Sequence, residues 1–239
     1  MKNLILYFFL FLGASIYSQN NSGIVIYKAI KKETSTDKIS DKDYKAFSEK
    51  LEKSAVQLEF KLQFNKHYSL FALKDGLTID KNDFNSQMAI MLLRGNNVYF
   101  TDKKLNALYE NTDFLSQKFS IKYKFEDLDW VITKDTKIIE GYKCYKAYYN
   151  RPFYDRNGDK KYGTVLAWFT QDISSSAGPF EAVGLPGLVL EFHSGKYIFI
   201  AKEIYLKKDI KIEKPSMEKT ISKAEFDNIQ KEKYLDLKN

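Results

Sequence analysis

The sequence predicts a mainly β protein, with one large, twisted and curved antiparallel sheet and a few short helices. Aromatic residues make up 15% of the 239 residues, and flat rings pack well on the half-buried face of a strand. Short segments with apolar residues at alternate positions recur along the chain, and several are separated by tight turns, which is typical of a meander. The chain has only 4 prolines and 11 glycines, a composition that disfavours disorder and fibrous repeats.

The first 18 residues have the pattern of a cleavable export signal. Lys2 precedes the apolar run 4–12, and small residues then lead to an expected cleavage site after Ser18. The apolar run is shorter than the about 20 residues that a transmembrane helix needs. No cysteine lies near the expected site, and no second long apolar run follows it. We therefore expect a mature chain, residues 19–239, with neither a lipid anchor nor a transmembrane segment.

The N-terminal half of the mature chain predicts strands and two helical segments. Residues 56–65 alternate: Leu58, Phe60, Leu62 and Phe64 share one face, as in a half-buried antiparallel strand. Tyr44, Phe47 and Leu51 have helical spacing within residues 35–53. Further strands are expected at 23–31, 68–73, 98–100, 105–109 and 119–125, and a short helix or irregular cover at 83–93.

The C-terminal half completes the expected sheet and adds a last helix. Strands are expected at 130–133, 136–149, 162–170, 187–193 and 196–206. Ser222 is a suitable cap for a helix at about 222–237. One β-rich domain covering 19–239 is the simplest organisation, shaped as a half-open barrel or bowl with short helices over its concave side. Periodicity leaves the choice between a closed barrel and an open sheet undecided.

A Gly-Pro loop before the strand at 187–193 is the least ordinary segment. Pro186 fixes φ and Gly187 tolerates a positive φ, so residues 185–188 suit a type II turn. Leucines at both ends of such a turn indicate either a packed corner or an apolar loop that presents Leu185, Pro186 and Leu188 to a partner or a lipid. The loop comprises Gly178, Pro179, Gly184, Leu185, Pro186, Gly187, Leu188 and Val189.

The hexapeptide 184–189 (Gly-Leu-Pro-Gly-Leu-Val) resembles the signature of the GLPGLI family of exported Bacteroidetes proteins, with Val189 in place of the final Ile. Residues 138–147, 168–170 and 178–179 also look similar to that family, so the resemblance covers most of the mature chain. It implies a β-rich envelope or secreted protein, and it implies no particular activity. A looser similarity is to the bowl-like N-terminal domain of some secreted glycoamidases.

The residues before and within the loop supply the candidate binding site. Trp168 and Phe169 are suited to a sugar or peptide platform, although neighbours in a strand face opposite sides and one of them is expected in the core. The candidate binding residues are Trp168, Phe169, Asp172, Leu185, Pro186 and Leu188.

Two other functions stay open. A hydrolase would use two carboxylates among Asp172, Glu181 and Glu191, with His193 beside them, and needs the pair within about 5–10 Å. No catalytic residue is assigned, because a Glu191–His193 pair is more often a hydrogen-bonded surface pair. A structural subunit of an envelope complex is the other alternative, for which exposed sheet edges and the lone Cys144 would be the marks.

No metal or cofactor is expected. Residues 155–159 resemble the start of a calcium loop, but Lys160 and Leu166 occupy positions that need Gly and Glu, so a hairpin turn is expected instead. The two histidines lack metal-ligand spacing. Cys144 is the only cysteine, which excludes an intrachain disulfide and favours an inert core thiol over a nucleophile.

The charge pattern and the expected export together limit the classes of partner that the protein is expected to bind. The formal net charge is +7, or +6 without Lys2, but lysines are scattered and acids lie among them. This pattern favours solvated strand faces over nucleic-acid binding. We therefore expect an exported protein of the periplasm, outer membrane or medium that binds an envelope protein partner, a peptide or a small apolar ligand on its curved sheet.

Overall fold

A computed structural model describes residues 21–32, 42–76, 83–155, 157–217 and 219–236, and the expected export signal at 1–18 lies outside them. The strands are β1 (Gly23–Lys31), β2 (Glu59–Phe64), β3 (Tyr68–Leu73), β4 (Val98–Asp102), β5 (Ala107–Phe114), β6 (Gln117–Lys124), β7 (Val131–Ile139), β8 (Tyr142–Tyr154), β9 (Lys160–Thr170), β10 (Leu188–Ser194), β11 (Tyr197–Leu206) and β12 (Thr220–Ser222). The helices are α1 (Lys42–Ala55), α2 (Phe84–Leu92) and α3 (Lys223–Asp236), with a 3-10 turn at Phe125–Asp127.

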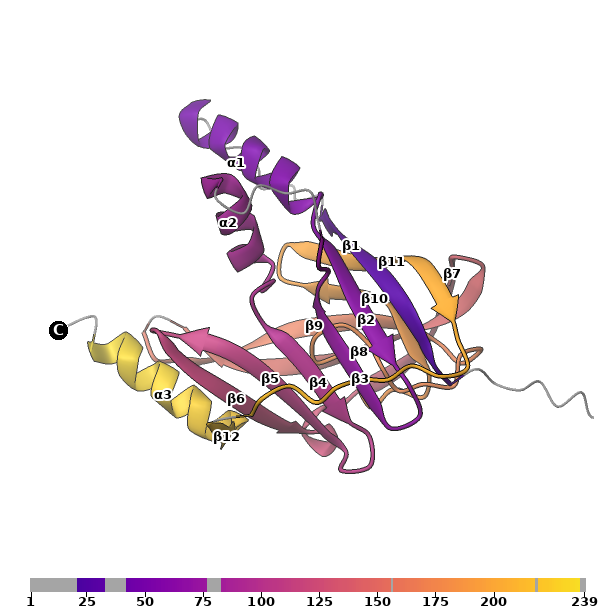
Figure 1. The fold of residues 1–239 in the computed structure, drawn as a ribbon. Helices are drawn as coiled ribbons and strands as arrows, with labels where there is room; N and C mark the ends of the chain where they lie inside the picture. The colour runs from indigo at the N-terminus through magenta and orange to yellow at the C-terminus, as the bar shows by residue number, and fades with distance from the viewer. Residues whose placement is uncertain (1–20, 33–41, 77–82, 156, 218, 237–239) are drawn as a thin grey trace, which may run out of the picture.

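The twelve strands form one sheet in the order β12-β6-β5-β4-β3-β2-β1-β11-β10-β9-β8-β7 (Figure 1). The sheet is not closed into a barrel, because β12 and β7 are its outermost strands. β2 to β6 form one antiparallel meander and β7 to β11 form another, and β1 joins them by pairing with both β2 and β11. The expected mainly β, curved meander is thus confirmed. β12, which lies parallel to β6, makes the sheet mixed.

Local sequence explains most of the strands and turns. The alternation in β2 holds, since Phe60, Leu62 and Phe64 are buried and their neighbours are not. Glu140 and Gly141, with φ of 47° and 82°, form the tight connection between β7 and β8, as in a hairpin turn with two positive φ values. β8 and β9 are joined as the expected hairpin, and the Asp155 carboxylate accepts from the backbone N–H groups of Asn157 and Asp159 in the connection.

The concave side of the sheet is filled by the β9–β10 loop, residues 171–187. Phe180 lies at its centre, 4.9 Å from the ring of Phe71, 4.6 Å from Phe199 and 5.5 Å from Phe192. These partners come from β3, β11 and β10, so a single loop residue contacts both meanders. Short helices were expected to cover this side, and they do so in part: α2 contributes Ala89 and Ile90 to the same core as Phe180, while the loop supplies the central residue.

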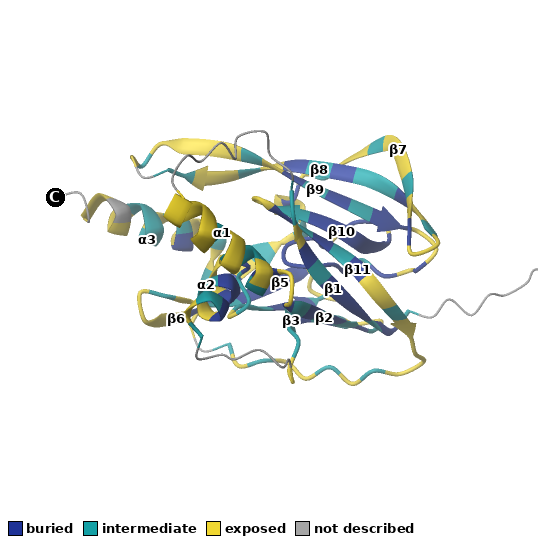
Figure 2. Cartoon of the chain, turned by 90° about the horizontal axis from the view of Figure 1, so that it is seen from above, coloured by how far each residue is buried: buried dark blue, intermediate teal, exposed yellow. Residues whose placement is uncertain are grey.

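The helices lie at the periphery. α1 and α2 pack on each other through Phe47 and Phe84 and project away from the sheet (Figure 1), and α1 is largely exposed (Figure 2). α3 begins after Ser222, whose hydroxyl accepts from the Glu225 N–H while the Glu225 carboxylate accepts from the Ser222 N–H, as in a capping box. Its Phe226 packs against Phe114 and Phe119.

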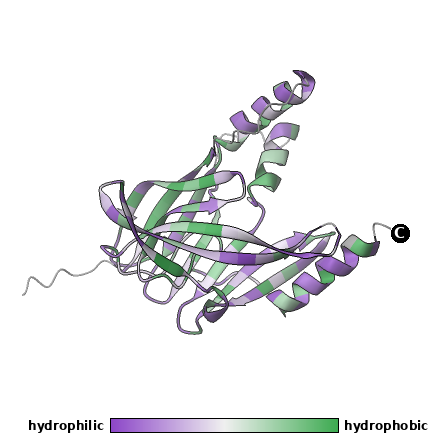
Figure 3. Ribbon diagram, turned by 180° about the vertical axis from the view of Figure 1, so that it is seen from behind, coloured by the Kyte–Doolittle hydropathy of each residue, from purple (hydrophilic) through white to green (hydrophobic). Residues whose placement is uncertain are grey.

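Both faces of the sheet carry apolar residues. Seen from behind, hydrophobic and hydrophilic bands alternate along the strands (Figure 3). A small cluster of Phe100, Ala107 and Tyr109 packs with Ile212 and Met217 of the segment between β11 and β12. That long connection therefore covers the side of β4 and β5 that faces away from Phe180. Within the described residues, every helix is too short or too polar to cross a membrane.

Candidate functional site

A cavity of about 540 Å³ in the described residues is a partly open cleft lined by β5, β6, β8, α3 and the chain that follows α2. These elements belong to opposite ends of the strand order, and the curvature of the sheet brings them together. α3 contributes Lys223, Phe226 and Asp227 to one wall. The cleft therefore lies at the mouth of the bowl rather than on its filled concave surface.

Glu110 on β5 forms one half of the cleft floor. Its Oε1 accepts from Arg94 Nη2 at 2.6 Å, Asn97 Nδ2 at 2.7 Å and the Tyr99 hydroxyl at 3.0 Å, while Oε2 accepts from the Tyr123 hydroxyl at 2.6 Å. Burial alone would raise the pKa of this carboxyl. The Arg94 charge and the hydrogen bonds outweigh burial and hold the pKa below its usual value, so Glu110 is ionised at neutral pH.

Glu181, in the loop next to Phe180, forms the other half. Its Oε1 contacts Arg151 Nη1 and lies 3.3 Å from the Tyr149 hydroxyl, which donates to it. Its Oε2 lies 3.8 Å from Arg94 Nη1. Burial and the neighbouring carboxylate raise the pKa of Tyr149, which keeps this hydroxyl protonated as a donor. The two carboxylates are thus joined through one guanidinium and held by fixed donors.

Arg94 connects the cleft to the core. It follows α2 with a positive φ of 56°, and its guanidinium carbon lies 5.5 Å from the centre of the Phe180 ring and 5.3 Å from that of Tyr99. Cation–π contacts of this length are favourable when they are shielded from water. A planar guanidinium suits this position because it stacks on rings while its edge binds carboxylates.

The rim of the cleft is aromatic. Phe153 is 45% exposed, and Phe114, Tyr154 and Phe226 also line the cleft. A charged floor with apolar rings around it offers both orientation by hydrogen bonds and contact area, which is the usual composition of ligand sites.

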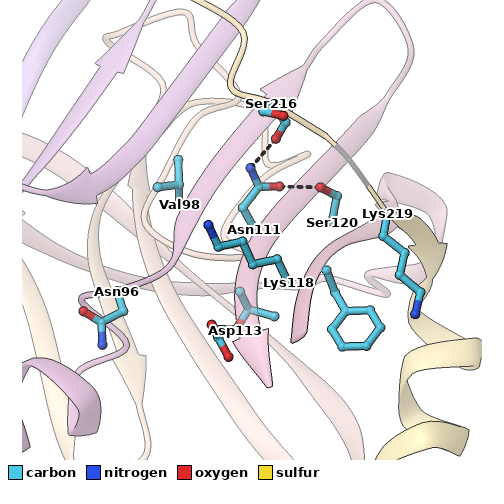
Figure 4. Close-up of a pocket in the computed structure, with 10 residues that line it drawn as sticks. Asn96, Val98, Asn111, Asp113, Lys118, Ser120, Ser216 and Lys219 are labelled. Carbon is cyan, nitrogen blue, oxygen red and sulfur yellow. Dashed lines mark hydrogen bonds between the residues drawn. The ribbon is translucent and has the colours of Figure 1, made fainter. Parts of the chain in front are cut away.

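A smaller cavity of about 280 Å³ lies next to the cleft and shares Asn96, Thr112 and Asp113 with it. At its centre the Asn111 amide donates to the Ser216 carbonyl and accepts from the Ser120 hydroxyl, both at 2.7 Å (Figure 4). These bonds tie the connection between β11 and β12 to β5 and β6. Since the Asn111 side chain already has partners on both sides, we assign it a structural role.

The residues expected to bind a ligand lie elsewhere. Phe169, Leu185 and Leu188 are buried in the core. Trp168 is half-buried, with Lys137 Nζ 4.4 Å from its ring centre. Asp172 and Pro186 are exposed. None of the six lines the 540 Å³ cleft, and a binding role for them stays a prediction.

The signature loop is a tightly packed corner. A Cβ on Gly187 would lie 2.0 Å from the Thr170 carbonyl oxygen, and one on Gly178 would lie 2.3 Å from that of Ala182. The expected type II turn is wrong: Gly187 lacks a positive φ, its N–H donates to the Leu185 carbonyl, and the positive φ belongs to Gly184. Gly187 is required here by close backbone approach, which turn propensities do not report.

The three carboxylates proposed for a hydrolase do not all line the cleft. Only Glu181 lines the cleft. Glu191 lies on β10, 2.6 Å from Lys137 Nζ and 2.7 Å from His193 Nε2, so the expected Glu191–His193 pair forms. Burial, together with Glu191 and Asp172, raises the pKa of the Cys144 thiol to about 11. Cys144 is buried as expected.

Sequence patterns missed Arg94, Glu110 and Arg151. One signal was available: the chain contains three arginines among 38 basic residues, and two of them bind the cleft carboxylates. In a lysine-rich chain, a rare arginine indicates a position that needs the planar, multiply donating group.

With this geometry established, the chain can be compared with known proteins. Residues 154–191 match the model of a family described as a protein of unknown function (Porph_ging). The matched segment includes β9, the loop with Phe180 and Glu181, and the signature. A search of curated proteins finds no match.

The fold is similar to that of PNGF-II. Its structure in space group P21 matches with a TM-score of 0.50 and 15% identity over 87% of this chain. The structure in space group C2 matches with a TM-score of 0.51 and 14% identity over 89% of this chain. In both cases the match covers 33% of the PNGF-II chain, so this chain spans about a third of the length of PNGF-II. At this level of identity the comparison establishes a shared fold.

Proposed function

We propose that the protein is exported and binds a peptide segment in the cleft above Arg94, Glu110, Arg151 and Glu181. One observation carries this proposal: two carboxylates and two guanidinium groups lie at the floor of a partly open cleft with an aromatic rim. Buried ion pairs contribute little net stability compared with apolar packing, so stability alone does not account for four charges in this place.

The chemistry of the floor favours a peptide. Two positive and two negative groups give no net charge when all are ionised. Such a floor suits a chain that presents both carbonyl acceptors and N–H donors, because guanidinium groups donate and carboxylates accept. Phe153 and Tyr154 at the end of β8 supply apolar surface for side chains of the ligand.

Binding is tested with a random peptide library and an oligosaccharide array as the two probes. The wild type is compared with Phe153→Ala, which removes a rim ring, and Tyr162→Ala, which removes a 63% exposed ring of β9 that does not line the cleft. We expect one class of peptides to bind the wild type and Tyr162→Ala equally, and Phe153→Ala about tenfold more weakly. The proposal would be refuted if the protein bound saccharides instead of peptides, or if Phe153→Ala bound peptides as tightly as the wild type.

Export rests on the pattern of residues 1–18 and has a direct test. N-terminal sequencing of the protein from the fraction outside the cytoplasm should begin at Gln19. A cytoplasmic protein that still begins at Met1 would contradict export, and it would leave peptide binding to be judged separately.

Peptide binding without hydrolysis is favoured over a carboxylate-dependent hydrolase. A general acid needs a raised pKa, whereas the pKa of Glu110 is lowered by Arg94 and its hydrogen-bond donors despite burial. Bound peptides should therefore be recovered intact after prolonged incubation. Cleavage by the wild type that is abolished in Glu181→Gln would reverse this choice. A subunit role through an interchain disulfide is disfavoured, because Cys144 is buried.

A further inference from the structure

Lys103 is a half-buried cation beside the signature loop. It follows β4, and its backbone N–H donates to the His67 carbonyl, which fixes the start of its side chain. Nζ donates to the Asn65 carbonyl at 2.7 Å and to Ser175 Oγ at 2.9 Å. An ammonium group has three N–H donors, so these two bonds leave one for a further acceptor.

The charge of Lys103 lacks a carboxylate partner among the described residues. The other strongly held cations, Arg94, Arg151 and Lys137, each contact a glutamate. For Lys103 the contacts are a carbonyl, a hydroxyl and the Phe64 ring at 5.9 Å. Burial without an acid lowers its pKa to about 8, which reports an unfavourable environment for the charge.

A cavity of about 450 Å³ opens at this lysine. Lys66 and Lys103, the three consecutive serines 174–176, and signature residues 185–187 are among its lining residues, and its lining includes no aspartate or glutamate. Ser175 Oγ accepts from Lys103, and its own proton is thereby directed away from the ammonium and is available as a second donor.

We propose that this cavity binds a tetrahedral oxyanion, a phosphate or sulfate group carried by a larger ligand, with Lys103 as the contacting cation and Ser175 as a hydroxyl donor. An anion would offset the cost of holding an unpaired charge in a half-buried position. The cavity is larger than a bare anion requires, so the remaining volume beside Pro186 receives the group that carries it. A side chain at position 187 would clash with the Thr170 backbone. Gly187 therefore lets residues 185–187 pack close to the end of β9, on the side of the cavity that faces the serines.

The proposal is independent of the peptide cleft, whose lining shares no residue with this cavity. It is tested by titrating the protein with inorganic phosphate, inorganic sulfate and acetate, followed by calorimetry and by the NMR signal of the Lys103 ammonium. The variants are Lys103→Met, Ser175→Ala and the matched control Lys104→Met, which removes an exposed neighbouring lysine.

We expect phosphate or sulfate to bind the wild type and Lys104→Met equally. Binding should fall more than about tenfold in Lys103→Met and less steeply in Ser175→Ala. Saturation of the wild type should also raise the pKa of Lys103, a readout that does not depend on whether a variant folds. Three outcomes would each overturn the proposal. Lys103→Met could bind the oxyanion as tightly as the wild type, the two lysine variants could lose the same affinity, or acetate could bind more tightly than phosphate and sulfate. The stronger of phosphate and sulfate identifies the source of the oxyanion.

Discussion

Arg94 places its guanidinium between Glu110 and Glu181, 2.6 Å from the first carboxylate and 3.8 Å from the second. Glu110 belongs to a strand of the first meander, whereas Glu181 belongs to the loop that fills the concave side. One side chain therefore links a sheet residue, a loop residue and, through its ring contacts, the aromatic core.

Replacing Arg94 by Met should destabilise the protein by about 3–5 kcal/mol, because it leaves buried carboxylates without their cation. Arg94→Lys should cost less, since the charge remains while the planar contacts are lost. Urea unfolding at neutral pH measures both. Lys202→Met, on an exposed position of β11, is the control and should stay within about 0.5 kcal/mol. If Arg94→Met lowers the free energy of unfolding no more than Lys202→Met does, the ion pairs of Arg94 with Glu110 and Glu181 do not contribute to stability.

Glu110 should make stability depend on acid pH. Its pKa in the folded protein is below the ordinary value of 4.5, so its stabilising contribution is complete above about pH 4.5 and is lost as the pH falls through the folded-state pKa. Unfolding free energies of the wild type and Glu110→Gln should therefore converge as the pH falls below 4.5. A difference between them that is constant from neutral pH to pH 3 would contradict the assigned ionisation.

Lys103 should produce a second rise of stability with pH, in the alkaline range. Its pKa is lowered from 10.5 to about 8 in the folded protein, so the unfolded chain binds more protons between these values and stability rises with pH across that window. Comparison with Lys103→Met isolates this rise, because the other lysines and tyrosines are common to both proteins. If the unfolding free energies of the two proteins change in parallel from pH 7 to pH 10.5, the lowered pKa of Lys103 is contradicted.

Gly187→Ala should destabilise the protein by about 2–4 kcal/mol, since the added Cβ would lie 2.0 Å from a backbone oxygen that cannot move without disturbing β9. Gly163→Ala on β9 is the matched control, because a Cβ there meets the Phe153 ring at an ordinary 3.6 Å. Thermal unfolding should separate the two variants clearly. Similar midpoints would show that the corner at 185–187 relaxes.

The sequence was informative where periodicity governs structure. Alternation identified β2, and the polar-apolar pattern with Ser222 identified α3, because these signals arise within one element. The loop 171–187 has no period, so its place inside the bowl was not predictable from local pattern. A core residue such as Phe180 is recognised only when its partners in β3, β10 and β11 are known.

The candidate site was hidden for a related reason. Arg94 follows a helix, Glu110 lies in β5, Arg151 lies in β8 beyond the expected strand end at 149, and Glu181 lies in the loop. Their proximity is produced by the curvature of a sheet whose strand order is not the order of the chain. Only the scarcity of arginine marked two of these positions in the sequence.

The position of Phe180 also bears on how the protein unfolds. Its ring contacts β2 and β3 on one side and β10 and β11 on the other, while the backbone pairing between the two meanders runs through β1 alone. Phe180 is therefore one of the contacts that couple the unfolding of the two meanders. With such contacts, the loss of either half removes packing from the other, and the twelve strands melt as a single cooperative unit.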